Sequence, residues 1–233
     1  TGMSDWNEDW TKNTAYSLED MADDVIAILD TLHIPKAHII GASLGGMIAQ
    51  TVCIDHPDRV LTLMSLMSTG DIMDKELPSI NSSTVTDLVL AQIRYGLINT
   101  ETNQIKLQLT ARLLLMGEDK YELVINDIAN TVLTNLRQRK GYNPESSKQQ
   151  IEATIISGSR YDELKNLSVP TLIIHGTTDP LIDFKHGEKC YNIIPNADKL
   201  WIDGMGHDIS PKFSEQIIAG ILVHINNYSN LDE

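Results

Sequence analysis

The sequence predicts an α/β fold in which a mostly parallel sheet is interrupted by a helical insertion. Short apolar runs of strand length alternate with stretches of helical periodicity towards both ends of the chain, as in parallel strands joined by crossover helices. Between about residues 73 and 157 only the helical periodicity is found. We therefore expect a first core segment over residues 1–72, a helical cap over 73–157 and a second core segment over 158–233.

The elements of the two core segments follow from local signals. Ser17 with Asp20 three residues later predicts a helix start, and apolar residues at helical spacing continue this helix towards Pro35. Apolar runs of four to six residues are too short for helices and predict buried parallel strands. In chain order, we expect a helix over 18–32, a strand over 37–40, a helix over 45–55, a strand over 60–65, a strand over 171–175, a helix over 184–193, a strand over 199–202 and a helix over 211–227.

Composition excludes several classes of function. The chain has 233 residues, with 18 Lys and Arg against 32 Asp and Glu, which gives a net charge of −14. This acidic balance argues against nucleic acid and anionic membranes as partners. No apolar run approaches the roughly 20 residues of a membrane span, and residues 1–10 do not resemble a signal peptide. Two cysteines without metal-ligand spacing are typical of buried thiols, so we expect a cytoplasmic protein.

The most informative motif is Gly-Ala-Ser-Leu-Gly at residues 41–45, between a predicted strand and a predicted helix. In this context G-x-S-x-G predicts a nucleophile elbow, a strained turn that exposes the serine hydroxyl at the carboxyl end of a strand. We expect small residues at Gly41 and Gly45 to let the strand and the helix pass closely. Ser43 is then the candidate nucleophile, and the Leu44 N–H at the helix start is a candidate oxyanion donor. The alternative is an ordinary glycine-rich turn.

A serine hydroxyl needs a neighbouring base, itself oriented by an acid, to act as a nucleophile at neutral pH. Asp179 follows the predicted strand over 171–175, and His207 follows the one over 199–202. Both therefore lie on loops at the carboxyl edge of the sheet, where Ser43 also lies. We expect His207 to be the base and Asp179 to be the acid.

Other residues compete for these roles. Asp71, after the predicted strand over 60–65, is an alternative acid, and His186 is an alternative base near the Asp179 loop. The remaining histidines lie at positions typical of structural residues: His33, His38, His56, His175 and His224. Met205, beside His207, is a candidate substrate-binding residue. The absence of a dinucleotide fingerprint, a P-loop and an HExxH motif predicts no cofactor and no metal.

These motifs resemble the α/β-hydrolase superfamily, in its cap-bearing serine esterase branch and nearest to the aclacinomycin methylesterase-like group. The resemblance rests on G-A-S-L-G-G at 41–46, H-G-T-T-D-P at 175–180 and G-M-G-H at 204–207. The order of serine, aspartate and histidine along the chain is also that of the family. The resemblance implies a parallel sheet of the α/β-hydrolase type and the roles given above for Ser43, Asp179, His207 and Leu44.

The start of the chain departs from the family pattern. Residues 1–4, Thr-Gly-Met-Ser, resemble the end of an R-D-T-G-x-S segment that precedes the elbow helix in relatives. Relatives carry several strands before that segment, and a loop after an early strand supplies their second oxyanion N–H. We therefore expect the 233 residues to be a fragment. The alternative is a chain that has lost activity.

The sequence predicts a serine hydrolase that cleaves a small-molecule carboxylic ester through an acyl-enzyme intermediate. Two alternatives stay open: carbon–carbon bond hydrolysis or cofactor-free perhydrolysis on the same three residues, and a non-catalytic ligand-binding protein on the same fold. The sequence indicates neither the oligomeric state nor the particular ester.

Overall fold

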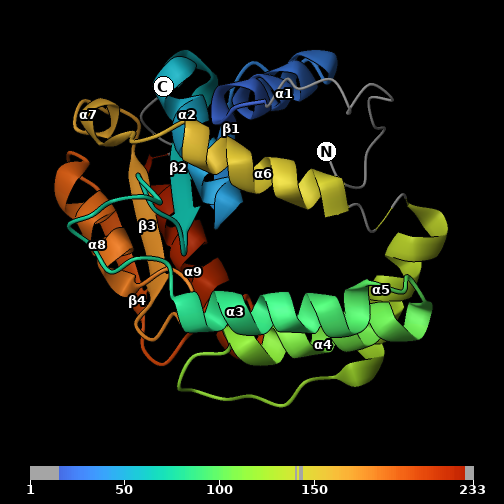
Figure 1. The fold of residues 1–233 in the computed structure, drawn as a ribbon. Coiled ribbons are helices and arrows are strands. Elements are labelled where there is room, and N and C mark those ends of the chain that lie inside the picture. The colour runs from blue at the N-terminus through green and yellow to red at the C-terminus, as the bar shows by residue number, and fades with distance from the viewer. Residues whose placement is uncertain (1–15, 140, 142–143, 229–233) are drawn as a thin grey trace.

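The protein is described by a computed structural model of residues 16–139, 141 and 144–228 (Figure 1). Its sheet has four strands among these residues: β1 (Ala37–Ala42), β2 (Val60–Leu66), β3 (Thr171–Gly176) and β4 (Asp198–Ile202). They lie in the order β1-β2-β3-β4, and all three neighbouring pairs are parallel. The predicted parallel sheet is confirmed, with strand ends that differ from the expected ones by at most two residues.

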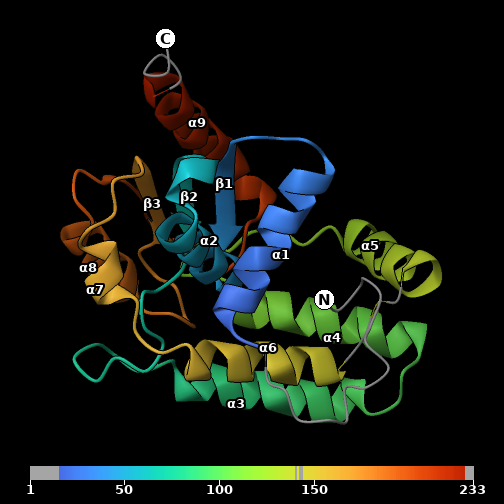
Figure 2. The ribbon, with the colours of Figure 1, turned by 90° about the horizontal axis from the view of Figure 1, so that it is seen from above.

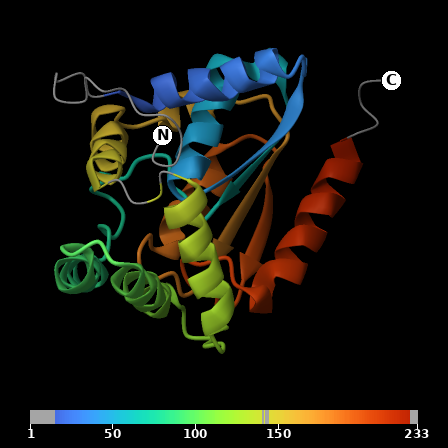
Figure 3. The ribbon, with the colours of Figure 1, turned by 90° about the vertical axis from the view of Figure 1, so that its right-hand side faces the viewer.

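Alternate residues of the strands face two separate cores. Leu63 and Ile173 pack on one face among residues of α2 (Leu44–Asp55) and α8 (Phe184–Ile193). Met64, Leu172 and Ile174 pack on the other face with residues of α9 (Pro211–Tyr228). Strands buried on both faces read as continuous apolar runs, which explains the runs in the sequence. Figure 3 shows the sheet between α9 on one side and α1 and α2 on the other.

The helix starts follow from local chemistry. Ser17 and Asp20 form a capping box, in which the Ser17 hydroxyl accepts from the Asp20 N–H and the Asp20 carboxylate accepts from the Ser17 N–H. The other helical elements are α1 (Leu18–Thr31), a 3-10 turn (Pro57–Arg59), α3 (Ser82–Ala91), a π-helical turn (Gln92–Gly96), α4 (Glu101–Leu115), α5 (Ile125–Gln138), α6 (Pro144–Ile156) and α7 (Tyr161–Leu164).

Between β2 and β3, the described residues of 73–157 form the helices α3 to α6, which we call the inserted helices. The described residues of 73–157 form no strand. α6 begins at Pro144, because proline lacks only an N–H that the first turn of a helix leaves unpaired. The strand arrows of β1 and β2 point towards the side where α3 and α4 lie. In Figure 2, α3, α4 and α6 lie opposite the C-terminal end of α9. The three segment boundaries stay predictions.

Further observations concern the sheet edge, the start of the sequence, the cysteines and the helices. In the part of the chain described here, β1 pairs only with β2, and its Ile40 is half exposed. Residues 1–4, which carry the resemblance to the segment before the elbow helix, lie outside the described residues. Cys53 and Cys190 are both buried and free, as predicted. Of the helices described, none combines the length and the apolar character that crossing a bilayer requires.

Candidate active site

Ser43 lies in a strained turn between β1 and α2. Its φ and ψ angles are 54° and −120°, in a region that residues with a Cβ rarely adopt. The turn is held from both sides, because the Ser43 N–H donates to Leu66 O at 2.9 Å and the Ser68 hydroxyl donates to Ser43 O at 2.8 Å. The serine is therefore fixed at the carboxyl end of β1 with its side chain directed out of the sheet.

Two crowded glycines, Gly41 and Gly46, make this turn possible, whereas the sequence predicted Gly41 and Gly45. A Cβ at Gly41 would lie 1.9 Å from Gly45 O, so the strand and the helix meet at a distance that only glycine allows at position 41. A Cβ at Gly45 would contact nothing within 4 Å, which makes the predicted need for a small residue there wrong. The second crowded position is Gly46, where a Cβ would lie 2.6 Å from the Ser68 side chain.

The loops after β3 and β4 bring Asp179 and His207 to this serine. His207 Nε2 lies 2.9 Å from Ser43 Oγ, and His207 Nδ1 lies 2.7 Å from Asp179 Oδ2. An ionised carboxylate only accepts hydrogen bonds, so Nδ1 donates to Asp179 and Nε2 is left to accept the Ser43 proton. The three side chains form one directed hydrogen-bonded chain, which we call the serine–histidine–aspartate chain.

The Asp179 carboxylate is fully buried and surrounded by donors. Its Oδ1 accepts from the Leu181 and Ile182 N–H groups at 2.8 and 3.0 Å. Its Oδ2 faces His207 and also His175 Nε2, at 3.3 Å. Burial acts to raise the pKa of this carboxyl, but the hydrogen bonds from His175 and His207 outweigh it and lower the pKa from 3.8 to about 2. The carboxylate is therefore ionised at neutral pH.

His175 was expected to be structural, and its contact with Asp179 was missed. Its Nε2 also lies 3.0 Å from Ile182 O, so this nitrogen carries the proton and shares it between the carbonyl and Asp179. The ring is fully buried in β3, and its Nδ1 has no partner among the described residues. The spacing in the sequence could have indicated this contact. His175 lies near the end of the predicted strand, and Asp179 follows four residues later in the loop after it.

The competing residues lie elsewhere. Asp71 Oδ1 accepts from the Met73 N–H at 2.8 Å, in the turn that leads away from β2. His186 is buried in α8, and its two ring nitrogens contact Thr69 Oγ1 and Pro78 O at 2.9 and 2.8 Å. Both groups have local partners, and neither belongs to the serine–histidine–aspartate chain.

The structure places the Met205 side chain in the interior. This side chain is fully buried and packs with Phe213 and Ile217 in the core beneath α9. Gly204, the residue before it, has a φ of 70°. The role of Met205 in binding a substrate stays a prediction. The Leu44 N–H, by contrast, is the first amide of α2 and has no acceptor within the described residues.

In the ranges 16–139, 141 and 144–228, no three His, Cys, Asp or Glu side chains converge in a way that could hold a metal ion. The groups that the site brings together are a hydroxyl, an imidazole, a carboxylate and a helix-start amide. These are the groups that acyl transfer through a serine requires.

Comparisons with known proteins agree with this chemistry at the level of the family. A family model described as alpha/beta hydrolase fold matches residues 4–212. Rhodomycin D methylesterase DnrP of Streptomyces peucetius is 26% identical over 219 residues, which cover 90% of this chain and 73% of that protein.

Solved structures share the fold. An esterase from Exiguobacterium antarcticum has a TM-score of 0.73 at 15% identity, covering 97% of this chain and 78% of its own. A meta-cleavage product hydrolase from Pseudomonas fluorescens has a TM-score of 0.65 at 19% identity, covering 93% and 74%. At these identities the likeness shows the fold alone.

Proposed function

The chain belongs to the alpha/beta hydrolase fold family, and from that premise we propose that it hydrolyses a carboxylic ester with Ser43 as the nucleophile. One observation carries the proposal: the Ser43 hydroxyl lies 2.9 Å from an imidazole whose other nitrogen lies 2.7 Å from a buried carboxylate. This arrangement gives a weak nucleophile both a base and an oriented tautomer of that base.

In the first half of the reaction, His207 Nε2 takes the Ser43 proton as Oγ bonds to the ester carbonyl carbon. The Leu44 N–H donates to the oxyanion that forms, and its place at the start of α2 adds the positive end of the helix dipole. The tetrahedral intermediate collapses when His207 returns its proton to the departing alkoxide. An alcohol leaves, and the acyl group stays on Ser43.

In the second half, water replaces the alcohol. His207 Nε2 takes a proton from the water, whose oxygen attacks the acyl carbon, and the proton then returns to Ser43 Oγ as the acid leaves. Asp179 keeps its charge throughout and stabilises the imidazolium of His207 in both halves. Its pKa of about 2 supports this role, because the carboxylate does not take up the proton.

The leaving group that we propose is methanol. The support is the likeness to rhodomycin D methylesterase DnrP, which is named for a methyl ester and is similar over 90% of this chain. The acid part of the ester is left open, since nothing in the described residues selects it.

The test has two parts. A fluorophosphonate probe should add one label to the chain, on the peptide that contains residues 41–46, and Ser43→Ala should abolish it. Methanol release from a panel of methyl esters should then exceed alcohol release from the matching ethyl esters. Labelling that persists in Ser43→Ala would exclude Ser43 as the nucleophile, and activity on carbon–carbon substrates without ester hydrolysis would exclude the ester proposal.

A further inference from the structure

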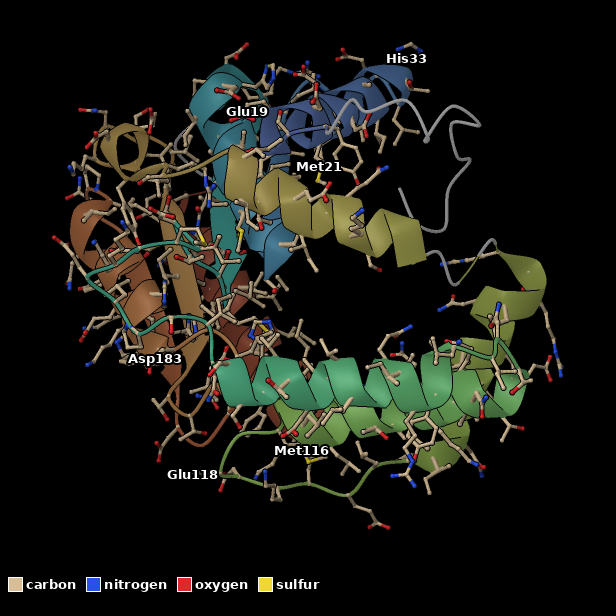
Figure 4. All side chains as sticks on the ribbon, viewed as in Figure 1. Glu19, Met21, His33, Met116, Glu118 and Asp183 are labelled. Carbon is tan, nitrogen blue, oxygen red and sulfur yellow. The ribbon has the colours of Figure 1, made fainter. Side chains whose placement is uncertain are left out.

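The inserted helices contact the candidate site at the segment of residues 115–121, which we call the strap. The strap leaves the C-terminal end of α4, and Figure 4 labels Met116 and Glu118 on it. Met116 is buried, so the strap packs against the core. Its neighbours there are the loops that carry His207 and Asp179.

Backbone hydrogen bonds join the strap to both loops. The His207 N–H donates to Leu115 O at 2.8 Å, and the Asp119 N–H donates to Gly204 O at 3.0 Å. The Glu118 N–H donates to Oγ1 of Thr178, the residue before Asp179, at 2.9 Å. The amide of the candidate base is therefore held by the last residue of an inserted helix.

Glycines on both sides allow this close approach. A Cβ at Gly117 would lie 2.4 Å from Gly204 O, and a Cβ at Gly206 would lie 2.1 Å from Gly117 N. Both clashes involve backbone atoms, which cannot turn away as the end of a side chain can. The strap and the histidine loop thus fit at this distance only with glycine at both positions.

Side chains reinforce the contact next to His207. The Asp208 carboxylate accepts from the Tyr121 hydroxyl, and Arg112 Nη1 of α4 lies 3.8 Å from its other oxygen. Burial, together with the charge of Asp208, raises the pKa of the Tyr121 hydroxyl, so this group stays a donor at neutral pH. The residue that follows His207 is thus also held by the inserted segment.

We propose that the strap is a positioning element of the serine–histidine–aspartate chain, so that His207 stays within reach of Ser43 only while α4 is docked on the core. A displacement of about 1 Å at a reacting group costs about 10²-fold in rate. Movement of the inserted helices away from the core would release the His207 amide and stop the chemistry. The inference rests on the proposed function of Ser43 and His207.

The test is Gly117→Ala. Relieving a 2.4 Å contact to an ordinary 3.4 Å contact moves the strap by about 1 Å. Gly220→Ala is the control, because Gly220 lies on α9, away from the strap. A Cβ there would also be crowded, at 2.5 Å from the end of the Leu200 side chain. We expect Gly117→Ala to slow fluorophosphonate labelling of Ser43 by about 10- to 100-fold and Gly220→Ala to stay within about twofold of the parent chain. Equal labelling of a folded Gly117→Ala would overturn the proposal.

A second pair of variants applies if Gly117→Ala does not fold. Thr178→Val keeps the shape and removes the oxygen that accepts from the Glu118 N–H, whereas Thr178→Ser keeps that oxygen. We expect labelling to slow by about fivefold or more in Thr178→Val and to be restored in Thr178→Ser. Equal rates in the two variants would contradict the proposal.

A spectroscopic readout separates this inference from the proposed function. The His207 Nδ1–H that bonds Asp179 should give a downfield proton resonance in the resting chain, assigned by its loss in His207→Ala. We expect Gly117→Ala to broaden or shift this resonance and Gly220→Ala to leave it unchanged. An unchanged resonance in Gly117→Ala overturns the strap proposal. Failure of the parent chain to be labelled refutes instead the proposed function.

Discussion

Replacing Asp179 by asparagine removes the charge from the buried end of the serine–histidine–aspartate chain and keeps its shape. Among the described residues, the Asp179 oxygen Oδ1 accepts only from the Leu181 and Ile182 N–H groups, so the asparagine carbonyl takes its place. The asparagine NH₂ must then occupy the position of Oδ2, 2.7 Å from His207 Nδ1 and 3.3 Å from His175 Nε2.

At this position the NH₂ group faces two imidazole nitrogens that both carry protons, so neither ring, in this tautomer, can accept a hydrogen bond from it. His175 cannot accept from the new NH₂ group, because its Nε2 carries a proton. His207 can accept only by moving its proton from Nδ1 to Nε2, which removes the lone pair that takes the Ser43 proton. We expect the rate of Ser43 acylation to fall by about 10⁴, as in other triads, which corresponds to about 5.5 kcal/mol.

The assay is the second-order rate of fluorophosphonate labelling, followed by intact mass, with thermal unfolding measured on the same samples. Asp71→Asn is the matched control, since the Asp71 carboxylate accepts only from the Met73 N–H in the described structure. The reasoning is refuted if Asp179→Asn stays within about tenfold of the parent chain, about 1.4 kcal/mol, while Asp71→Asn shows the large loss. Small effects in both variants would also refute it, because the two carboxylates would then substitute for each other.

Three further predictions follow from burial and crowding. Gly41→Ala should destabilise the chain by about 1–3 kcal/mol, whereas Gly45→Ala should stabilise it by up to about 1 kcal/mol; urea titrations in which Gly45→Ala is the worse variant would contradict this. The pKa of Asp179 in the folded chain lies below its ordinary value of 3.8. Its contribution to the free energy of unfolding is therefore present above pH 3.8 and is lost as the pH falls towards 2. Between pH 3.8 and 2, the free energy of unfolding of the parent chain should fall by about 2 kcal/mol more than that of Asp179→Asn. Parallel curves of unfolding free energy against pH for the two proteins would disprove the lowered pKa. Burial raises the pKa of the Cys190 thiol to about 11 and also raises that of Cys53, so neither thiol should react with a disulfide reagent at neutral pH until the chain unfolds.

The features that the sequence predicted depend on neighbours along the chain. The capping box at Ser17 needs two residues three apart, and a buried parallel strand needs a short apolar run bounded by turn residues. Placing Ser43, Asp179 and His207 near one another needed only the rule that parallel strands end at the same edge of the sheet. The structure brings these three side chains into hydrogen-bonding distance, and their roles stay predictions.

The features that were missed depend on contacts between distant segments. Gly46 is crowded by Ser68, which follows a different strand, so no local pattern separates it from the uncrowded Gly45. Met205 packs in the core with Phe213 and Ile217, and the G-x-G motif alone does not fix the direction of its side chain. The strap joins residues about 60 to 90 positions apart, and its glycine at position 117 has no recognisable motif around it.

The depth of Asp179 explains why its loop needs so many donors. A buried carboxylate interacts more strongly with an imidazolium than an exposed one, because the surrounding medium screens the charge less. The same burial penalises the charged form and acts to raise its pKa. Two backbone N–H groups and two imidazole N–H groups offset this cost, and one of the imidazoles, that of His175, does not itself reach Ser43. His175 is thus one of four donors that together keep a fully buried carboxylate ionised at neutral pH.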